Sequence, residues 1–310
     1  MTVTYYEDDP KATHRRQILE RLVTARQAEQ AGNLPWEILG NPAYKQCLAP
    51  SLTVIITLYN YRTYVNQCLL SVFESVRKDL PGQFEILVID DGSTDGSTAL
   101  VESFLKKTAL PLALVKKTFN TGLADTRNLG LRLARGKYCF ILDADNWIYP
   151  DCLGQLYRAI AGTDYAAVYN IIVQFDDLTG KKVGLLSQYE WDVNELLTAP
   201  YIDAMALFDK EALLNVGGYS TELVKHGWFG WEDYDLWLKL AQANYNCKLV
   251  PQILSAYRLH SRSMLNTTQF YARKLCHYFE HKFEALLLVY PKHTRTITFG
   301  LEHDFLEAMV

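Results

Sequence analysis

The sequence contains no apolar stretch long enough to cross a membrane as a helix, and its first residues lack the basic-then-apolar pattern of a signal peptide. We therefore expect a cytoplasmic protein, either free or held peripherally at the inner face of the membrane. The six cysteines include no Cys-x-x-Cys pair, and several lie in apolar patterns. They are predicted to be buried thiols rather than disulfides or zinc ligands.

A large excess of one charge is also absent. The 31 Lys and Arg residues nearly balance the 35 Asp and Glu residues, which gives a formal net charge of -4. This balance argues against a nucleic-acid-binding surface, so anionic ligands must be held by local groups. The 310 residues are 49% hydrophobic and 21% charged, as in an ordinary globular protein. We expect one main domain with appendages.

Apolar runs of strand length alternate with amphipathic segments along the first part of the main domain. The predicted strands are 52–58, 84–89, 112–115 and 138–142, and the predicted helices between them are 63–77, 97–107 and a segment ending at 134. Alternation at this spacing indicates right-handed βαβ crossovers. The expected fold is therefore an α/β fold with a mostly parallel sheet flanked by helices.

Both ends of the chain are predicted to be helical extensions. The segment 11–30 has the composition of an amphipathic helix, and most of 271–290 is also predicted to be helical. The expected apolar stripe of the first helix consists of Ile18, Leu19, Leu22 and Val23. We divide the chain into an N-terminal helical extension (1–50), a main domain (51–263) and a C-terminal helical extension (264–310). The roles of the extensions stay open.

Two carboxylates follow the apolar run at 138–142. Asp143 and Asp145 are two residues apart, so on an extended chain their side chains point the same way and can address one ligand. Two such acids repel each other unless a cation joins them. Oxygen ligands suit Mg²⁺ or Mn²⁺, which usually bind together with a substrate phosphate. The same segment could instead be a turn or a helix cap after a strand.

Four polar clusters stand at expected strand ends or loop edges: Asp90-Asp91, Asp143 with Asp145, Glu232-Asp233, and His260. In order, the motifs are Asp-Asp-Gly-Ser, Asn-x-Gly with Ala-x-x-Arg-Asn, Asp-x-Asp, Trp-Glu-Asp and Arg-x-His. This ordered set resembles the family 2 glycosyltransferases of the GT-A fold, over roughly residues 51–263. The resemblance implies a Rossmann-like sheet and transfer of a sugar, with inversion, from a nucleotide-diphospho-sugar to an acceptor hydroxyl. The acceptor could be a glycan, a lipid-linked molecule or another hydroxyl-bearing molecule.

The resemblance also implies residue roles. The expected nucleotide-binding residues are Thr57, Tyr59, Asp91, Arg127 and Asp143. A UDP-sugar is the expected donor, because a carboxylate such as Asp91 can accept the imide N–H of uracil. The expected metal ligands are Asp145 first, then His260 and Asp143, holding Mn²⁺ or Mg²⁺. An imidazole beside carboxylates fits Mn²⁺ better.

Asp233 is the expected general base, because an acceptor hydroxyl is a poor nucleophile until a carboxylate takes its proton. Glu232 would orient the acceptor, and Glu232 and Asp235 are alternatives for the base. Acids at this position could also merely complement a helix dipole. Trp228 and Trp231 favour the functional interpretation, because aromatic faces commonly stack on sugar rings, and they are the expected acceptor-binding residues.

Two other interpretations compete with this one. Nucleotidyl transfer to sugar phosphates uses related sheets, but it usually requires a Gly-rich basic loop after the first strand, where this chain has Tyr59-Asn60-Tyr61-Arg62. A catalytically inactive nucleotide-sugar or carbohydrate-binding scaffold on the same fold is the second alternative. The joint presence of Asp145, Asp233 and His260 argues against it without proving turnover.

Overall fold

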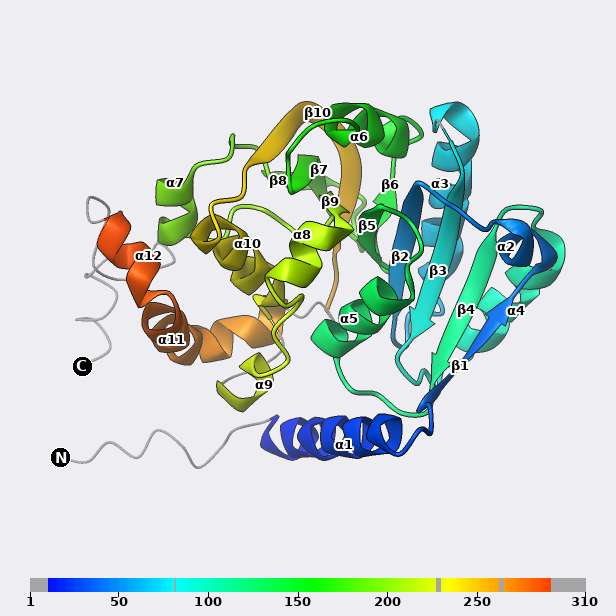
Figure 1. The fold of residues 1–310 in the computed structure, drawn as a ribbon, viewed down its shortest axis with the longest axis horizontal. Coiled ribbons are helices and arrows are strands. Elements are labelled where there is room, and N and C mark those ends of the chain that lie inside the picture. The colour runs from blue at the N-terminus through cyan, green and yellow to red at the C-terminus, as the bar shows by residue number, and fades with distance from the viewer. Residues whose placement is uncertain (1–10, 81, 227–229, 262–264, 291–310) are drawn as a thin grey trace.

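The structure, a computed structural model, describes residues 11–80, 82–226, 230–261 and 265–290. One mixed sheet runs through this part of the chain, with helices on both of its faces (Figure 1). Its strands, in spatial order, are β1 (Trp36–Gly40), β4 (Leu112–Lys117), β3 (Phe84–Asp90), β2 (Leu52–Leu58), β5 (Tyr138–Asp143), β9 (Ala206–Asp209), β7 (Ala167–Asp176), β10 (Cys247–Leu259) and β6 (Trp147–Ile148), with β8 (Lys182–Leu186) paired to β7. The predicted α/β fold is confirmed.

Most of the strand pairing is parallel. β2 lies between β3 and β5 and runs parallel to both, and β4 extends this parallel block beyond β3. β7 and β10 form a second parallel pair, and β9 lies antiparallel between β5 and β7. The sheet therefore joins two parallel blocks through one short antiparallel strand.

The helices predicted before β6 lie within two residues of their observed positions. The described helices are α1 (Ala12–Gln30), α2 (Pro42–Gln46), α3 (Val65–Asp79), α4 (Ser97–Lys107), α5 (Leu123–Leu133), α6 (Cys152–Ile160), α7 (Val193–Thr198), α8 (Lys210–Asn215), α9 (Leu223–His226), α10 (Glu232–Gln242), α11 (Leu265–Lys282) and α12 (Glu284–Val289). In the described ranges, no helix has both the length and the apolar character needed to cross a bilayer. The six cysteines are buried free thiols, as predicted.

Strand β2 shows how the sheet builds a core on each face. Ile55 packs in a cluster that includes α1, α5, α10 and α11, whereas Val54 and Ile56 pack in a cluster with α3, α4 and α6. Successive side chains of a strand point to opposite faces, so a strand covered on both sides has an unbroken apolar sequence. This burial explains the continuous apolar run at 52–58.

The carboxyl ends of the three central strands lie side by side. Thr57 is paired with Asp143 across β2 and β5, and Leu58 is paired with Asp90 across β2 and β3. After β2, the chain forms β3 on one side of β2 and later forms β5 on the other side. This edge is therefore a topological switch point, where open α/β sheets bind ligands.

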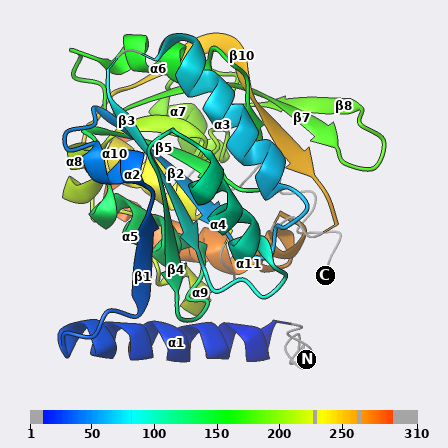
Figure 2. The ribbon, with the colours of Figure 1, turned by 90° about the vertical axis from the view of Figure 1, so that its right-hand side faces the viewer.

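The N-terminal extension differs from the prediction in two ways. Its helix is confirmed, but Val23 is 53% exposed while Ile18 and Leu22 are buried, so the apolar stripe is narrower than expected. The segment also contains a strand that the sequence analysis did not predict. β1 pairs antiparallel with β4 at the edge of the sheet and is half exposed, which leaves it no strong apolar pattern. In Figure 2, α1 runs below this edge of the sheet.

The second half of the chain was predicted less completely. The elements β6, β8, β9, α7 and α9 were not predicted, and each is at most six residues long. The sequence pattern also predicts a strand near 247–250. The observed strand β10 continues to Leu259, because its pairing with β7 persists through register shifts after Val250. The prediction that most of 271–290 is helical is confirmed, with a break at Phe283, and the observed helix begins earlier, at Leu265. These short or irregular elements depend on tertiary pairing more than on local pattern.

Two adjacent leucines of α3 test this packing. Leu69 is fully buried in the cluster with α4 and α6, whereas Leu70 is 50% exposed. Leu69→Ala is expected to lower the free energy of unfolding by about 2 to 5 kcal/mol, because it leaves a cavity in the core. Leu70→Ala is the matched control and should cost about 1 kcal/mol or less. Equal losses in urea unfolding would contradict the packing.

Candidate active site

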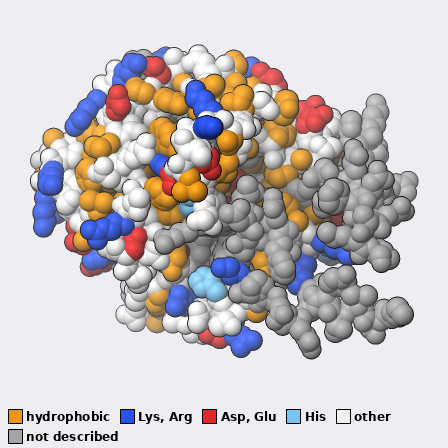
Figure 3. Space-filling view, turned by 180° about the vertical axis from the view of Figure 1, so that it is seen from behind, with side chains coloured by type: hydrophobic (Ala, Val, Ile, Leu, Met, Phe, Trp, Pro, Cys, Tyr) orange, Lys and Arg blue, Asp and Glu red, His pale blue; other side chains and the backbone are white. Residues whose placement is uncertain are grey.

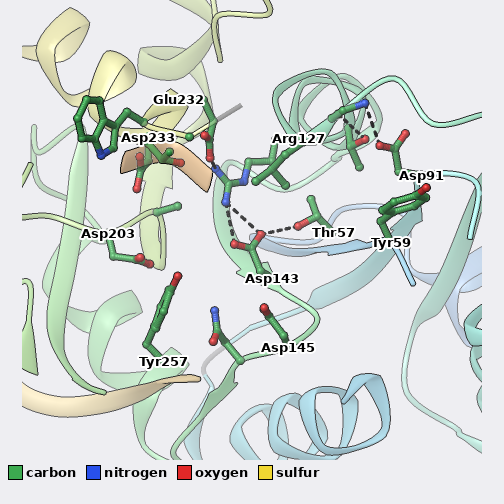
Figure 4. Close-up of a pocket in the computed structure, with 18 of the residues that line it drawn as sticks. Thr57, Tyr59, Asp91, Arg127, Asp143, Asp145, Asp203, Glu232, Asp233 and Tyr257 are labelled. Atoms are coloured by element: carbon green, nitrogen blue, oxygen red, sulfur yellow. Dashed lines mark hydrogen bonds and ion pairs between the residues drawn. The ribbon is translucent and has the colours of Figure 1, made fainter. Parts of the chain in front are cut away.

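A cavity of about 510 Å³ opens at this edge of the sheet. Figure 4 shows its polar side chains converging from several elements. The predicted site residues that line it are Thr57, Tyr59, Asp91, Arg127, Asp143, Asp145, Trp231, Glu232 and Asp233. The fold therefore gathers these residues from β2, β3, α5, β5 and the start of α10 around one space.

Arg127 lies at the centre of the site with 1% of its surface exposed. Its Nη2 donates to both carboxylate oxygens of Asp143, at 3.0 and 2.9 Å, and its Nη1 donates to Oε1 of Glu232 at 2.5 Å. The hydroxyl of Thr57 donates to Asp143 at 2.5 Å. These bonds connect four elements of the fold. Arg127 is thus a buried cation, rather than a solvated charge on a helix.

Asp91 is held from inside the protein. Its carboxylate accepts the backbone N–H groups of Thr121 and Gly122, each at 2.9 Å, and lies 2.7 Å from Nζ of Lys117. Burial raises the pKa of Asp91, and the Lys117 charge acts against that rise. The side chain still lines the cavity, so Asp91 is fixed in place at the cavity wall.

The neighbouring residues of the Asp-Asp-Gly-Ser motif form the turn itself. Asp90 accepts the N–H of Ser93 at 2.9 Å, so its side chain closes the turn that follows β3. Gly92 has a φ of +75°, and a Cβ there would lie 3.0 Å from the backbone nitrogen of Asn120. The motif therefore combines a structural turn with one acid that faces the cavity.

Asp145 and His260 form a hydrogen-bonded pair at the site. Asp145 Oδ2 lies 3.0 Å from Nε2 of His260, and Asp145 Oδ1 is buried with no hydrogen-bond partner among the described residues. Burial and the charge of Asp143 raise the pKa of Asp145, while the hydrogen bond with His260 lowers it. A buried unpaired carboxylate oxygen is costly. A divalent cation at this oxygen would remove that cost, and an oxygen–nitrogen donor set suits Mn²⁺.

The three predicted metal residues do not form one cluster. No group of three His, Cys, Asp or Glu side chains within the described ranges is arranged to hold a metal ion. Asp145 and His260 meet, but Asp143 is turned to Arg127 and Thr57. Two protein ligands would leave positions for water and for phosphate oxygens of a substrate, as is common for Mg²⁺ and similar ions.

The start of α10 places two more acids at the cavity. Glu232 and Asp233 follow Trp231, whose φ of 67° is left-handed and uncommon for a bulky residue. Burial and the charge of Asp233 raise the pKa of Glu232, and the adjacent Arg127 guanidinium opposes that rise by stabilising the ionised carboxylate. Burial and the charge of Asp143 also raise the pKa of Asp233. The ionised form of a carboxylate is a stronger proton acceptor when its pKa is raised toward neutral pH.

The structure argues against Asp235 as an alternative base. Asp235 is completely buried, and its carboxylate lies 2.6 Å from Nζ of Lys282 in α11 and accepts the hydroxyl of Ser220. Asp235 comes two residues after Asp233 on the helix, so its side chain faces the core instead of the cavity. Its role is to join α10 to the C-terminal helix.

The sequence analysis missed three residues of the site. Asp203 and Tyr257 line the cavity, and Figure 4 places their polar ends close together beside Asp233. Burial raises the pKa of Asp203 to about 7, and the charge of Asp233 adds to that rise. Lys117 supports Asp91 from behind. The sequence offers little signal for Asp203, which lies in an irregular segment before the unpredicted β9.

Both extensions also reach the cavity. His14 of α1 and Thr268 of α11 line it together with Trp231, whose ring centroid lies 6.4 Å from that of Phe279. Trp228, the other expected acceptor-binding residue, lies outside the described residues. The ends of the chain therefore contribute side chains to the wall near the start of α10.

Comparisons with known proteins identify the family of this chain. The family model described as glycosyl transferase family 2 matches residues 53–217, which is more than half of the chain. An uncharacterized glycosyltransferase of Haemophilus influenzae (strain ATCC 51907 / DSM 11121 / KW20 / Rd) is 26% identical over 226 residues, covering 68% of this chain and 66% of that protein. Glycosyltransferase GlyA of Streptococcus pneumoniae serotype 4 (strain ATCC BAA-334 / TIGR4) is 35% identical over 109 residues, covering 35% of this chain and 15% of GlyA. The chain thus spans less than two thirds of each relative.

Solved structures share the fold. TarS 1-349 of S. aureus in complex with UDP-GlcNAc has a TM-score of 0.55 and 18% identity, covering 70% of this chain and 61% of that one. The mannosyltransferase PcManGT of Pyrobaculum calidifontis, in complex with GDP-Man and Mn²⁺, has a TM-score of 0.53 and 22% identity, covering 80% of this chain and 69% of that one. The expected GT-A type of α/β fold is thereby confirmed. With its family-model match and the predicted motifs gathered around one cavity, the chain belongs to glycosyl transferase family 2.

Proposed function

We propose that this chain transfers a hexosyl unit from a UDP-sugar to an acceptor hydroxyl, with inversion at the anomeric carbon. The observation that carries the proposal is that Asp145, paired with His260, and Asp233 approach one cavity from different elements. One acid is then available at the diphosphate of the donor and the other at the acceptor. Membership of glycosyl transferase family 2 supports the reaction class.

The uracil would bind at the end of the cavity lined by Thr57, Tyr59 and Asp91. Tyr59 is 37% exposed and offers a ring face for stacking. Each carboxylate oxygen has two lone pairs, so Asp91 can accept an imide N–H in addition to its internal hydrogen bonds. The UDP-GlcNAc complex of TarS supports a uridine donor, whereas PcManGT holds GDP-Man. In this proposal, the preference for uracil over guanine depends on Asp91.

Asp145 and His260 would hold Mn²⁺ or Mg²⁺, with Asp143 in a supporting position beside Arg127. The unpaired Oδ1 of Asp145 and the Mn²⁺ in the PcManGT complex support this assignment. When bound, a divalent ion would stabilise the negative charge that grows on the departing diphosphate. Arg127 keeps the Asp143 carboxylate in place, so that the acids near the diphosphate need little rearrangement.

Asp233 would act as the general base. The acceptor oxygen attacks the anomeric carbon as the bond from that carbon to the diphosphate oxygen breaks, and the bonding electrons leave with the diphosphate. The acceptor proton passes to Asp233, whose pKa is raised by burial. Glu232, held by Arg127, would orient the acceptor, and Trp231 would stack on a sugar ring. Inversion follows from this single displacement.

Replacing the proposed general base should reduce the rate of transfer without weakening donor binding. Asp233→Asn keeps the size of the side chain but cannot take a proton, so kcat is expected to fall about 10²- to 10⁴-fold. UDP binding should stay within about twofold, because Asp233 is assigned to the acceptor end. Asp151→Asn is the control, since Asp151 is a surface acid paired with Lys78. Unchanged transfer by Asp233→Asn would exclude it as the base.

A thermal-shift panel tests the donor and metal assignments. UDP with Mn²⁺ is expected to raise the Tm by about 4 to 8 °C at a concentration about 100-fold above its Kd. The rise should need Mn²⁺ and should disappear in Asp145→Ala. Asp164→Ala, at an exposed position, should leave it intact. A larger rise with GDP or CDP would contradict the uracil assignment, and no rise with any nucleotide would favour the scaffold interpretation.

The raised pKa of Asp203 should make the stability of the protein depend on pH. The folded state keeps a proton on Asp203 up to about pH 7, whereas the unfolded chain releases it near pH 4. The wild type therefore loses stability as the pH rises through this window. Asp203→Asn carries no such proton, so its Tm relative to wild type should increase by about 2 to 6 °C between pH 5 and pH 8. A difference that does not change with pH would contradict the raised pKa.

A further inference from the structure

The β7–β8 hairpin projects from the body of the molecule (Figure 2). Its turn exposes Leu178 almost completely, at 94%, and its second strand exposes Val183 and Leu185 at 56% and 41%. Val183 and Leu185 are two residues apart and share one face of β8. A large apolar side chain at the tip of a hairpin has no role in the core.

The exposed end of the hairpin is also basic. Lys181 and Lys182 are both exposed beside Leu178. Of the two acids of the turn, Asp177 is paired with Arg258, whereas Asp176 accepts the N–H of Thr179 at 2.8 Å and keeps its negative charge. The two lysines therefore exceed the unpaired acid by one charge. The two lysines therefore stand next to the exposed apolar residues along the chain, with Lys182 on the opposite face of β8 from Val183 and Leu185. The net charge of the whole chain is -4.

Protection of the sheet edge explains part of this pattern. β8 is an edge strand, and lysines commonly prevent such strands from pairing with other chains. That role does not require an exposed leucine at the turn or an apolar stripe on the outer face of β8. The combination of apolar and basic side chains is instead the pattern of elements that lie in the interface of an anionic bilayer.

The hairpin is attached directly to the cavity wall. Gln174 of β7 and Leu186 of β8 line the cavity. At the turn, the Asp177 carboxylate pairs with Arg258, whose Nε donates to the backbone oxygen of Asp145 at 2.8 Å. The position of the hairpin is therefore linked to that of Asp145. A surface that binds the tip would lie next to the opening of the site.

Arg258 makes this connection stiff. Its guanidinium lies over the rings of Tyr64, Trp147 and Phe175, at 4.4, 5.0 and 4.9 Å from their centroids. The Tyr64 hydroxyl in turn donates to Asp177 at 2.8 Å. Cation–π contacts and a buried ion pair fix the base of the hairpin while its tip stays exposed.

We propose that the tip of the β7–β8 hairpin binds an anionic membrane surface and that the acceptor of the transfer is accordingly lipid-linked. The second part of this proposal depends on the proposed glycosyltransferase function. Leu178, Val183 and Leu185 enter the boundary between head groups and acyl chains, and Lys181 and Lys182 contact anionic head groups. Figure 3 views the molecule from the side to which the hairpin extends, where basic side chains project among hydrophobic ones.

Vesicle flotation of the full chain tests the membrane contact. The chain is expected to float with vesicles of phosphatidylcholine and phosphatidylglycerol in equal parts, less at high salt, and not with phosphatidylcholine alone. Each lysine near such a surface contributes about fivefold to binding. Lys181→Glu/Lys182→Glu should therefore weaken flotation at least about 20-fold. Lys106→Glu/Lys107→Glu changes the charge equally at an exposed pair on α4 and should have a much smaller effect.

An apolar pair of variants separates insertion from charge attraction. Leu178→Ser should weaken flotation about tenfold, whereas Leu48→Ser, at a position that is 80% exposed, should leave it unchanged. If the chain does not float with anionic vesicles, or if hairpin and control variants weaken flotation equally, the proposal is wrong. Hairpin-dependent capture by a protein, without flotation, would likewise overturn it.

The acceptor class is tested apart from the donor site. The hairpin variants should keep the UDP-dependent rise in Tm, because their residues lie outside the nucleotide end of the cavity. Transfer to a polyprenyl-phosphate-linked acceptor in anionic vesicles should fall in Leu178→Ser, while hydrolysis of the UDP-sugar should not change. Equal transfer by wild type and Leu178→Ser would overturn the acceptor assignment. Loss of UDP binding in the wild type would instead reject the proposed function and leave the flotation result to stand.

Discussion

A guanidinium buried between two carboxylates is the interaction on which the site depends. Arg127 bonds to Asp143 at the end of β5 and to Glu232 at the start of α10, so it connects the central sheet to the helix that carries Asp233. Removing one partner of a buried ion pair typically costs about 3 to 5 kcal/mol, because the remaining charge is left unpaired. The pair therefore fixes the two halves of the cavity relative to each other before any ligand binds.

Buried cations divide the acids of the site into two classes. Asp91 is held by Lys117, and Asp143 by Arg127, so both are fixed parts of the wall. Among the described side chains, Asp203 and Asp233 face the cavity without an ion pair to Lys or Arg, and Asp145 is paired with the imidazole of His260 instead. Burial raises the pKa of all three. A cavity with this excess of acids favours ligands that bring a divalent cation or many hydroxyl groups, which is consistent with a metal-bound nucleotide sugar and a sugar acceptor.

The two extensions and the β7–β8 hairpin contribute residues to the cavity wall. His14 of α1 and Thr268 of α11 line the cavity together with Trp231, while Lys282 of α11 pairs with Asp235 of α10. On the other side, Asp177 joins the hairpin to the backbone of Asp145 through Arg258. Segments remote from the family motifs thus line the cavity or contact residues that line it.

The sequence by itself determined the central sheet and most of the site. Strands buried on both faces, such as β2 and β5, are continuous apolar runs, and the acids that follow them necessarily share one edge in a parallel sheet. Tertiary structure alone decided the partners of those acids. Whether Asp143 meets a metal or Arg127, whether Asp235 faces the cavity or Lys282, and whether Asp203 belongs to the site depend on side-chain direction and on contacts between distant segments. The strands β1 and β9 and the β7–β8 hairpin were likewise not predictable from the sequence. Short strands with little apolar pattern are stabilised by their neighbours rather than by local sequence.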